Sequence, residues 1–358
     1  HTANGVLKHV ERDMKSFFNS CKSYSSDPSK FTGVPKLPSY KRKGGMCSFD
    51  VSNQECVIKH TDDGRYFAKL PHTKERVYLA REIHGRLKEV HVTPMNNVFR
   101  FSFVFDDEKA VPEKMTEKPE RVIGIDMGVS NLMAVVNNCG LPSMLYKGGV
   151  SKSANHFYNK RIAEMVSAQT AGTAKKFVPT ANYMKATQKR NNQIRDYMHK
   201  TSKHLISWCV ENRIDTIVIG ENRGWKREAG MSRESNQKFV QIPHDQLKRY
   251  IEYRAEREGI RVILQEESYT SKASYLQKDV MPVYGKEEGN PVFSGKREGR
   301  LYKTETGLQI NADLNGAANI VRKNMPAAFA AYEPDFRRIR VIRHPDRPEE
   351  QHAIPDRV

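Results

Sequence analysis

Hydrophobic and polar residues alternate in two different ways along the first third of this chain. Residues 1–24 carry apolar side chains at helical spacing, whereas between residues 46 and 106 the spacing shortens to two, which is typical of strands. In the segment 98–105 every second residue is a phenylalanine, and we expect this row to face a core, although a base-stacking platform has the same pattern. The pattern predicts a small β-barrel or sheet module with strands at 47–51, 66–70, 89–93 and 98–105.

Beyond residue 119 the apolar runs alternate between strand length and helix length. The predicted strands are 122–125, 132–136, 144–146, 216–221 and 261–264, and the predicted helices are 155–169, 182–212, 244–258 and one that opens near 310. Three strands followed by helix, strand, helix, strand and helix is the order of a ribonuclease-H-like α/β domain. We expect residues 265–310 to be a weakly periodic insertion and the chain from Met325 onward to be loosely ordered.

Three acidic residues interrupt this apolar pattern. Asp126 lies in the first strand of the α/β region, Glu221 ends the fourth, and Asp313 lies at the start of the last helix. If the first and fourth strands are neighbours, the three carboxylates meet at one edge of the sheet. Each acid alone has a simpler explanation, as a turn residue, a surface acid and a helix cap respectively. Together they indicate a Mg²⁺ or Mn²⁺ site, in which two ions can activate water for phosphodiester hydrolysis.

The net charge of the chain favours a polyanionic partner. Among 358 residues, 60 Lys and Arg stand against 42 Asp and Glu, a net charge of +18 that is typical of nucleic-acid binding. The five cysteines are scattered without a C-x-x-C pair, which excludes a disulfide framework and predicts a reducing, cytoplasmic location. No apolar run has membrane-spanning length. Because the chain opens at His1 inside a helical pattern, we expect an N-terminal portion to precede it.

Basic residues that lie near aromatic ones are candidates for nucleic-acid contacts. The backbone of a single strand is held by cations, and its bases stack on aromatic rings. A solvated surface has a similar composition, so this pattern alone does not decide between the two. The candidate residues are Tyr40, Lys41, Arg42, Lys43, Lys189, Arg190, Arg223, Trp225 and Lys226, with Tyr40 and Trp225 for stacking.

Several motifs resemble those of one known family. GIDMGVSNL (124–132), IGEN (219–222) and NADLNGAANIVRK (311–323) closely resemble the RuvC-type nuclease domain of transposon-encoded TnpB proteins. The segments 189–209 and 267–274 are also similar to TnpB, so the resemblance covers roughly residues 120–325. The segments KSFFNSCKSY (15–24) and GVPKLPSYKRKGG (33–45) resemble the wedge region of the family more loosely.

The resemblance implies an activity and the residues that perform it. TnpB proteins are RNA-guided DNA endonucleases related to the type V CRISPR effectors, so a guide RNA and double-stranded DNA with a short adjacent motif are the expected partners. Asp126, Glu221 and Asp313 match the catalytic triad of the family. Asp126 and Asp313 would ligate metal, and Glu221 would share ligation and orient the attacking water. Asn222 and Asn315 are candidates for residues that contact these ligands without binding the metal themselves.

The resemblance also suggests domain boundaries. The expected domains are a helical segment at 1–30, a β-rich wedge-like module at 31–118, a RuvC-like nuclease domain at 119–325 with an insertion at 265–310, and a tail at 326–358. Many relatives carry a four-Cys zinc ribbon within that insertion, but this chain has no cysteine there. We therefore expect no structural zinc, and a loop that packing or nucleic acid holds in place.

Two other functions stay open at this stage. One is an RNA-guided DNA-binding repressor that does not cut, which the loss of any of the three acids would favour. The other is a guide-independent ribonuclease-H-like nuclease or transposase with the same metal chemistry. All three acids are present, and the upstream region resembles the wedge, so the sequence favours the guided nuclease.

Overall fold

The chain folds into two compact units, one of residues 1–109 with 180–188 and the other of residues 110–179 with 189–358. The structure is a computed structural model, and it describes residues 2–40, 43–71, 73–79, 85–96, 98–106, 119–172, 176–221, 242–283 and 290–346. Each unit has its own buried core. Within the described residues, no helix combines the length and the apolar character that crossing a bilayer requires.

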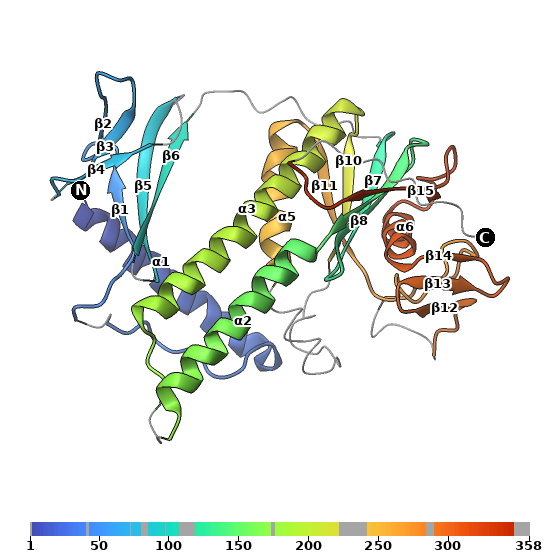
Figure 1. The fold of residues 1–358 in the computed structure, drawn as a ribbon, viewed down its shortest axis with the longest axis horizontal. Helices are drawn as coiled ribbons and strands as arrows, with labels where there is room; N and C mark the ends of the chain where they lie inside the picture. The colour runs from blue at the N-terminus through green and yellow to red at the C-terminus, as the bar shows by residue number, and fades with distance from the viewer. Residues whose placement is uncertain are drawn as a thin grey trace. The chain divides into compact units, whose positions relative to one another are not determined.

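The first unit is built from a helix and two antiparallel three-stranded sheets (Figure 1). The sheets have the strand orders β1-β5-β6 and β2-β3-β4, and their inner faces share one core. Phe101 and Phe103 pack against that core, while Phe99 is 44% exposed, so the predicted phenylalanine row is core only in its middle. The elements are α1 (Thr2–Ser26), η1 (Pro28–Lys30), β1 (Phe49–Ser52), β2 (Val57–His60), β3 (Tyr66–Lys69), β4 (Arg76–Tyr78), β5 (Arg86–Met95) and β6 (Val98–Asp106). A closed barrel is not confirmed by these two sheets.

The second unit is organised around a six-stranded mixed sheet. Its strand order is β11-β10-β7-β8-β9-β15, with β8 antiparallel to both of its neighbours and the other pairs parallel. The strands are β7 (Val122–Met127), β8 (Asn131–Asn137), β9 (Pro142–Lys147), β10 (Thr216–Glu221), β11 (Arg261–Glu266) and β15 (Asp335–Ile342). The first and fourth strands of the α/β region, β7 and β10, are neighbours, with Ile125 opposite Ile219, so the condition for their acids to meet at one edge of the sheet is fulfilled.

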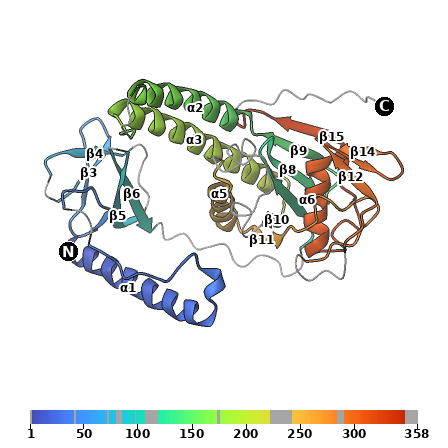
Figure 2. The same ribbon diagram turned by 90° about the horizontal axis from the view of Figure 1, so that it is seen from below.

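Helices cover both faces of this sheet, which explains why its central strands are apolar throughout. The helices are α2 (Gly149–Thr170), α3 (Ala181–Glu211), α5 (His244–Arg257) and α6 (Ala312–Asn324). On one face, α3 and α5 enclose the larger core, and on the other face α6 packs over Val122, Ala134 and Val218 (Figures 1 and 2). All seven residues of β8 are buried. The α6 helix approaches the sheet closely because small residues line its inner surface.

The structure adds strands to two regions of the second unit in which none were predicted. The region 265–310, predicted as a weakly periodic insertion, contains a sheet of β12 (Gly295–Glu298), β13 (Leu301–Thr304) and β14 (Gln309–Asn311). The chain after Met325 is not loosely ordered throughout, because β15 pairs with β9 at the edge of the main sheet. Both were missed for the same physical reason: these strands are short or lie at an edge, so polar and basic residues occupy their exposed positions.

The contact between α6 and β7 can be tested at Gly124. A Cβ atom on Gly124 would lie 2.6 Å from the backbone oxygen of Ala317 and would collide with Val321. We expect Gly124→Ala to lower the free energy of unfolding by about 1–3 kcal/mol, because a backbone atom cannot move aside cheaply. Gly149→Ala is the matched control, since a Cβ there meets nothing within 4 Å. Calorimetric unfolding of the two variants measures the difference, and equal stabilities would contradict this packing.

Candidate active site

The carboxyl ends of β7 and β10 and the start of α6 bring the three predicted acids to one end of the sheet. Asp126 is the penultimate residue of β7, Glu221 is the last residue of β10, and Asp313 is the second residue of α6. The amino-terminal cap of α6 is Asn311, whose side chain accepts hydrogen bonds from the backbone nitrogens of Asp313 and Leu314. Asp313 is therefore not the cap that its sequence position allowed, and its carboxylate is available for other contacts.

Two glycines make room for carboxylates at this end of the sheet. A Cβ atom on Gly316 of α6 would lie 2.7 Å from the Oδ2 atom of Asp126. A Cβ atom on Gly220 of β10 would collide with the carboxylate of Glu267, which immediately follows β11. The side chains of Asp126 and Glu267 thus lie on the α6 face of the sheet. Asp126 occupies the space that a side chain at position 316 would fill, and Glu267 occupies the space that a side chain at position 220 would fill.

Asp126 and Glu267 are both buried and both lie near other negative charges, and each of these conditions raises the pKa of a carboxyl group. Burial raises the pKa of Asp126 well above its usual range, and the charges of Glu267 and Asp313 raise it further, while Arg297 lowers it. Burial also raises the pKa of Glu267 to about 7, with Glu266 and Glu221 adding to the shift and Lys248 opposing it. Carboxylates that raise each other's pKa in this way are destabilised when ionised, so a bound cation would stabilise the cluster.

Glu267 is a site residue that the sequence interpretation did not identify. Glu266 ends β11 opposite Glu221 of β10, and Glu266 is neutralised by Lys323, whose Nζ atom lies 2.6 Å from its Oε2 atom. Glu267 turns towards Asp126 instead. One sequence signal could have identified Glu267: it is an acid that directly follows the predicted strand at 261–264. Parallel strands end at the same edge of a sheet, so an acid at this position can reach the acids that follow β7 and β10.

Glu221 lies less close to Asp126 than the sequence suggested. Side chains alternate between the faces of a strand, and Gly220 faces α6, so Glu221 leaves β10 towards the opposite face. It remains near enough to Glu267 to raise the pKa of that residue. Among the residues that the structure describes, no three His, Cys, Asp or Glu side chains are gathered as a metal site.

Asp313 is held by two donors from different elements. Its Oδ1 atom accepts from Nη2 of Arg297 at 2.8 Å, and its Oδ2 atom accepts from Nδ2 of Asn131 at 2.7 Å. Arg297 is 41% exposed, so it can leave Asp313 without losing a buried environment. Each carboxylate oxygen has a second acceptor position, so these bonds leave room for a cation. The hard oxygen donors and the mutual repulsion of the acids both fit a divalent metal ion.

The loop that precedes β12 is anchored by side chains of α6 and by an aspartate. Asn315 accepts from the backbone nitrogen of Tyr275 at 3.0 Å and donates to the backbone oxygen of Ala273 at 2.8 Å. Asn319 donates to the backbone oxygens of Thr270 and Ala273. Asp279 accepts from the backbone nitrogens of Ser274 and Ser294, at 2.7 and 3.0 Å, which ties the segments around these two serines together. Asn315 thus positions this loop.

The candidate nucleic-acid contacts have different surroundings. Tyr40 is fully exposed, and Lys43 and Lys189 are exposed. Arg190 is half-buried: its Nε atom donates to Oδ1 of Asn155 at 2.7 Å, and its guanidinium lies 5.5 Å from the ring centre of Tyr158. Arg190 therefore joins α3 to α2. The remaining candidates, Lys41, Arg42, Asn222, Arg223, Trp225 and Lys226, lie outside the described residues.

Comparisons with known proteins agree with the motifs. A family model for a probable transposase, OrfB_IS605, matches residues 104–226, and a model for the Cas12f1-like TNB domain matches residues 244–320. The CRISPR-associated endodeoxyribonuclease Cas12f1 of Sulfoacidibacillus thermotolerans is 22% identical over 331 residues, covering 83% of this chain and 73% of that protein. The TnpB-like protein ORF457 of Acidianus two-tailed virus is 26% identical over 213 residues, covering 58% of this chain and 42% of that protein.

Two solved structures of Cas12f complexes show a weak overall likeness to this chain. A Cas12f1 structure with single-guide RNA and target DNA has a TM-score of 0.47 at 15% identity and covers 87% of this chain and 70% of its own. A Cas12f ternary complex has a TM-score of 0.38 at 12% identity, covering 89% of this chain and 74% of its own. The two family models match regions that contain Asp126, Glu221, Glu267 and Asp313. Two regions of the chain thus match the OrfB_IS605 and Cas12f1-like TNB family models, and two similar proteins are named Cas12f1 and TnpB-like, in agreement with the motifs.

Proposed function

We propose that this protein is an RNA-guided, metal-dependent DNA endonuclease that hydrolyses phosphodiesters at a RuvC-like site. The observation that carries the proposal is that the charges of Glu267, which follows β11, and of Asp313, at the start of α6, both act on the buried Asp126 of β7, in a chain that matches a family model for a probable transposase. One relative is named an endodeoxyribonuclease, and similar solved chains are held with guide RNA and target DNA. The net charge of +18 supports the same partners, a guide RNA and a duplex with a short adjacent motif.

Four acids are the proposed ligands of Mg²⁺ or Mn²⁺, with two ions as the expected number. Asp126 lies against Gly316 of α6, the charges of Glu267 and Asp313 act on Asp126, and Glu221 acts on Glu267, so a change of rotamer would be needed to bring Glu221 to a shared metal. A metal bound there supplies an activated water and stabilises the leaving oxygen of the phosphodiester. The protein's own part is to position the acids: Asn131 fixes the orientation of Asp313, and Arg297 neutralises it until a cation arrives.

A second candidate function is guided DNA binding without cleavage. It is favoured by the state of the acids in the structure. Asp313 is paired with Arg297, and among the described residues no three acids are gathered closely enough to hold one metal ion. Both functions share the wedge-like module proposed for residues 31–118 and the nuclease domain proposed for 119–325. They differ in whether divalent metal produces cutting, so the cleavage experiment separates them.

Cleavage should depend on Asp126. Asp126→Asn keeps the shape of the side chain but removes the charge that a metal requires, so we expect cleavage of a guide-matched target to fall by more than about 100-fold. Binding of guide and target should stay within twofold of wild type, roughly, because phosphate contacts supply most of that affinity. Asp62→Asn, in an exposed turn, is the control. Wild-type cleavage by Asp126→Asn would contradict the proposed site.

Without divalent metal, the acid cluster should make stability depend on pH. The folded state holds the proton of Glu267 more tightly than the unfolded state, since its pKa is about 7 instead of the usual 4.5. The stability that this proton contributes is present below pH 4.5 and is lost as the pH rises through 7. Glu267→Gln should therefore be more stable than wild type at pH 8, by the order of 1–3 kcal/mol, and similar to it at pH 4.5.

Thermal unfolding measures this difference, with Glu164→Gln on the exposed surface of α2 as the control. Adding Mg²⁺ at pH 8 should raise the melting temperature of wild type more than that of Glu267→Gln, because the cation relieves the same repulsion. If Glu267→Gln follows wild type at both pH values and in both metal conditions, Glu267 does not belong to the cluster.

The guide requirement can be tested on the purified protein. RNA that co-purifies with the full-length protein from its native host should be a discrete species, because a guided enzyme retains its guide through many phosphate contacts. Sequencing of the bound RNA is the measurement. Random fragments of cellular RNA would point instead to a guide-independent nuclease of the same fold.

A further inference from the structure

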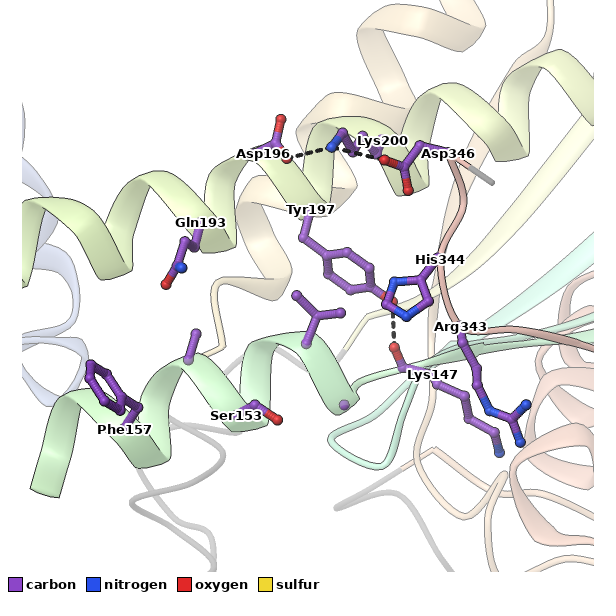
Figure 3. A pocket seen from close by; sticks show the side chains of 13 residues that line it. Lys147, Ser153, Phe157, Gln193, Asp196, Tyr197, Lys200, Arg343, His344 and Asp346 are labelled. Carbon is purple, nitrogen blue, oxygen red and sulfur yellow. Dashed lines mark hydrogen bonds and ion pairs between the residues drawn. The ribbon is translucent and has the colours of Figure 1, made fainter. Parts of the chain in front are cut away.

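The second unit contains a cavity of about 830 Å³ (Figure 3). Its walls are the first turns of α2, the middle of α3, the end of β9 and the segment 343–346 that follows β15. All these residues belong to the same compact unit. The volume is within the range of about 300–1,000 Å³ that is common for ligand pockets.

One end of the cavity has an excess of positive charge. Lys147 and Arg343 line this end, and their side chains lie together in Figure 3. Partial burial lowers the pKa of Lys147, and the charges of Arg300, Arg343 and Lys152 lower it further, while the charge of Asp313 opposes this shift. Cations that repel one another in this way are stabilised by a bound anion.

The acids of the cavity do not balance this charge. Asp196 and Asp346 also line it, but both carboxylates bind Lys200, with their Oδ2 atoms 2.9 and 3.0 Å from its Nζ atom. Figure 3 shows this ion-pair network along α3, apart from Lys147 and Arg343. Among the described residues that line the cavity, neither acid pairs with Lys147 or Arg343, so this end can accept an anion from outside the protein.

The cationic end is connected to the acid cluster by hydrogen bonds. The Nζ atom of Lys147 donates to Oδ1 of Asn131 at 2.9 Å, and Nδ2 of Asn131 donates to Asp313 at 2.7 Å. The backbone oxygen of Lys147 accepts from the hydroxyl of Tyr197 at 2.5 Å, which ties the end of β9 to α3. A group bound at Lys147 thus lies two hydrogen bonds from a proposed metal ligand.

The opposite end of the cavity is apolar and carries an aromatic ring. Phe157 of α2 is 62% exposed, and Val150 and Ala154 line the same helix wall. In Figure 3, Phe157 lies at the far end of the cavity from Arg343, with Gln193 across from it on α3. An exposed ring next to an amide suits an unpaired base, which stacks on one and hydrogen-bonds to the other.

We propose that this cavity binds one or two unpaired nucleotides of the DNA strand that runs through the acid cluster. A phosphate lies between Lys147 and Arg343, and a base rests on the wall formed by Phe157 and Val150. A base that is still paired cannot enter a cavity between two helices, so the site selects single-stranded DNA. The proposal rests on the proposed nuclease function and adds to it a site that holds the substrate strand.

Photocrosslinking tests the site directly. The probe is a single-stranded 15-nucleotide DNA in which 4-thiothymidine replaces thymidine, mixed with the full chain and Mg²⁺, and crosslinked peptides are identified by mass spectrometry. We expect crosslinks in the peptides that contain Phe157 and Gln193. Phe157→Ala should reduce this crosslink about fivefold or more, because base stacking on the ring is lost. A fully paired duplex of the same sequence should not crosslink there.

The cationic end is tested by salt dependence. Arg343→Gln should weaken binding of the unmodified single strand and lower the slope of log affinity against log salt by about 0.7, the value for one phosphate contact with a single strand. Lys147→Gln should act in the same way, although it also loses the bond to Asn131. Lys160→Gln, on the exposed surface of α2, is the control and should lower the crosslink yield at Phe157 by less than about twofold.

The outcomes separate this proposal from the proposed function. Crosslinks confined to other peptides, or an Arg343→Gln variant that matches Lys160→Gln in both crosslink yield and salt slope, would overturn the nucleotide site while leaving cleavage intact. In the opposite case, crosslinks at Phe157 with no metal-dependent cleavage would overturn the nuclease and retain the strand-binding site. Asp126→Asn should crosslink as wild type does, because it changes the acid cluster and leaves the cavity walls unchanged.

Discussion

The second unit depends on one unfavourable interaction, the repulsion among carboxylates that are crowded at the end of its sheet. Asp126, Glu267 and Asp313 come from three different parts of the chain. The charges of Glu267 and Asp313 both make the ionisation of Asp126 less favourable, and Glu267 is itself destabilised by neighbouring acids when ionised. Acids are rarely placed this way for stability alone, because burial and like charge both oppose ionisation. The arrangement is explained if the folded protein is completed by a divalent cation.

The rest of the unit holds these acids in place against that repulsion. Gly220 and Gly316 provide the space, and Gly124 lets α6 come close enough to carry Asp313 to β7. Asn315 and Asn319, both fully buried, fasten the loop after β11 to α6, so that Glu267 and Asp313 are fixed relative to each other. Asp279 closes that loop through two serines.

The sequence was informative wherever burial was strong. The strands β7, β8 and β10 and the helices α3, α5 and α6 were predicted nearly to their ends, because an apolar run that is buried on both faces has a clear pattern. The sequence left open whether β7 and β10 are neighbours, and the structure shows that they pair in parallel. The strands β12 to β15 were missed, since their exposed faces carry basic and polar residues and each depends on partners distant in sequence.

The site could be predicted only in part for a related reason. Asp126 and Asp313 stood out because a carboxylate is unusual in an apolar strand and near a buried helix start. Glu267 did not stand out, because it follows Glu266 in a polar segment. The sequence does not tell which of these two glutamates turns towards Asp126, since this depends on the ion pair between Glu266 and Lys323. The direction of Glu221 depends on the exact end of β10, where alternation turns it away from α6. Side-chain direction at a strand end is a property of register, which spacing does not define.

The central claim is that these acids bind divalent metal, and anomalous diffraction from crystals grown with Mn²⁺ tests it most directly. The account predicts an anomalous peak within coordination distance of Asp126 and Asp313, with Glu221 or Glu267 turned towards it and Arg297 displaced from Asp313. An intact pair of Arg297 and Asp313, without manganese at the end of β7 in crystals at pH 8, would contradict it.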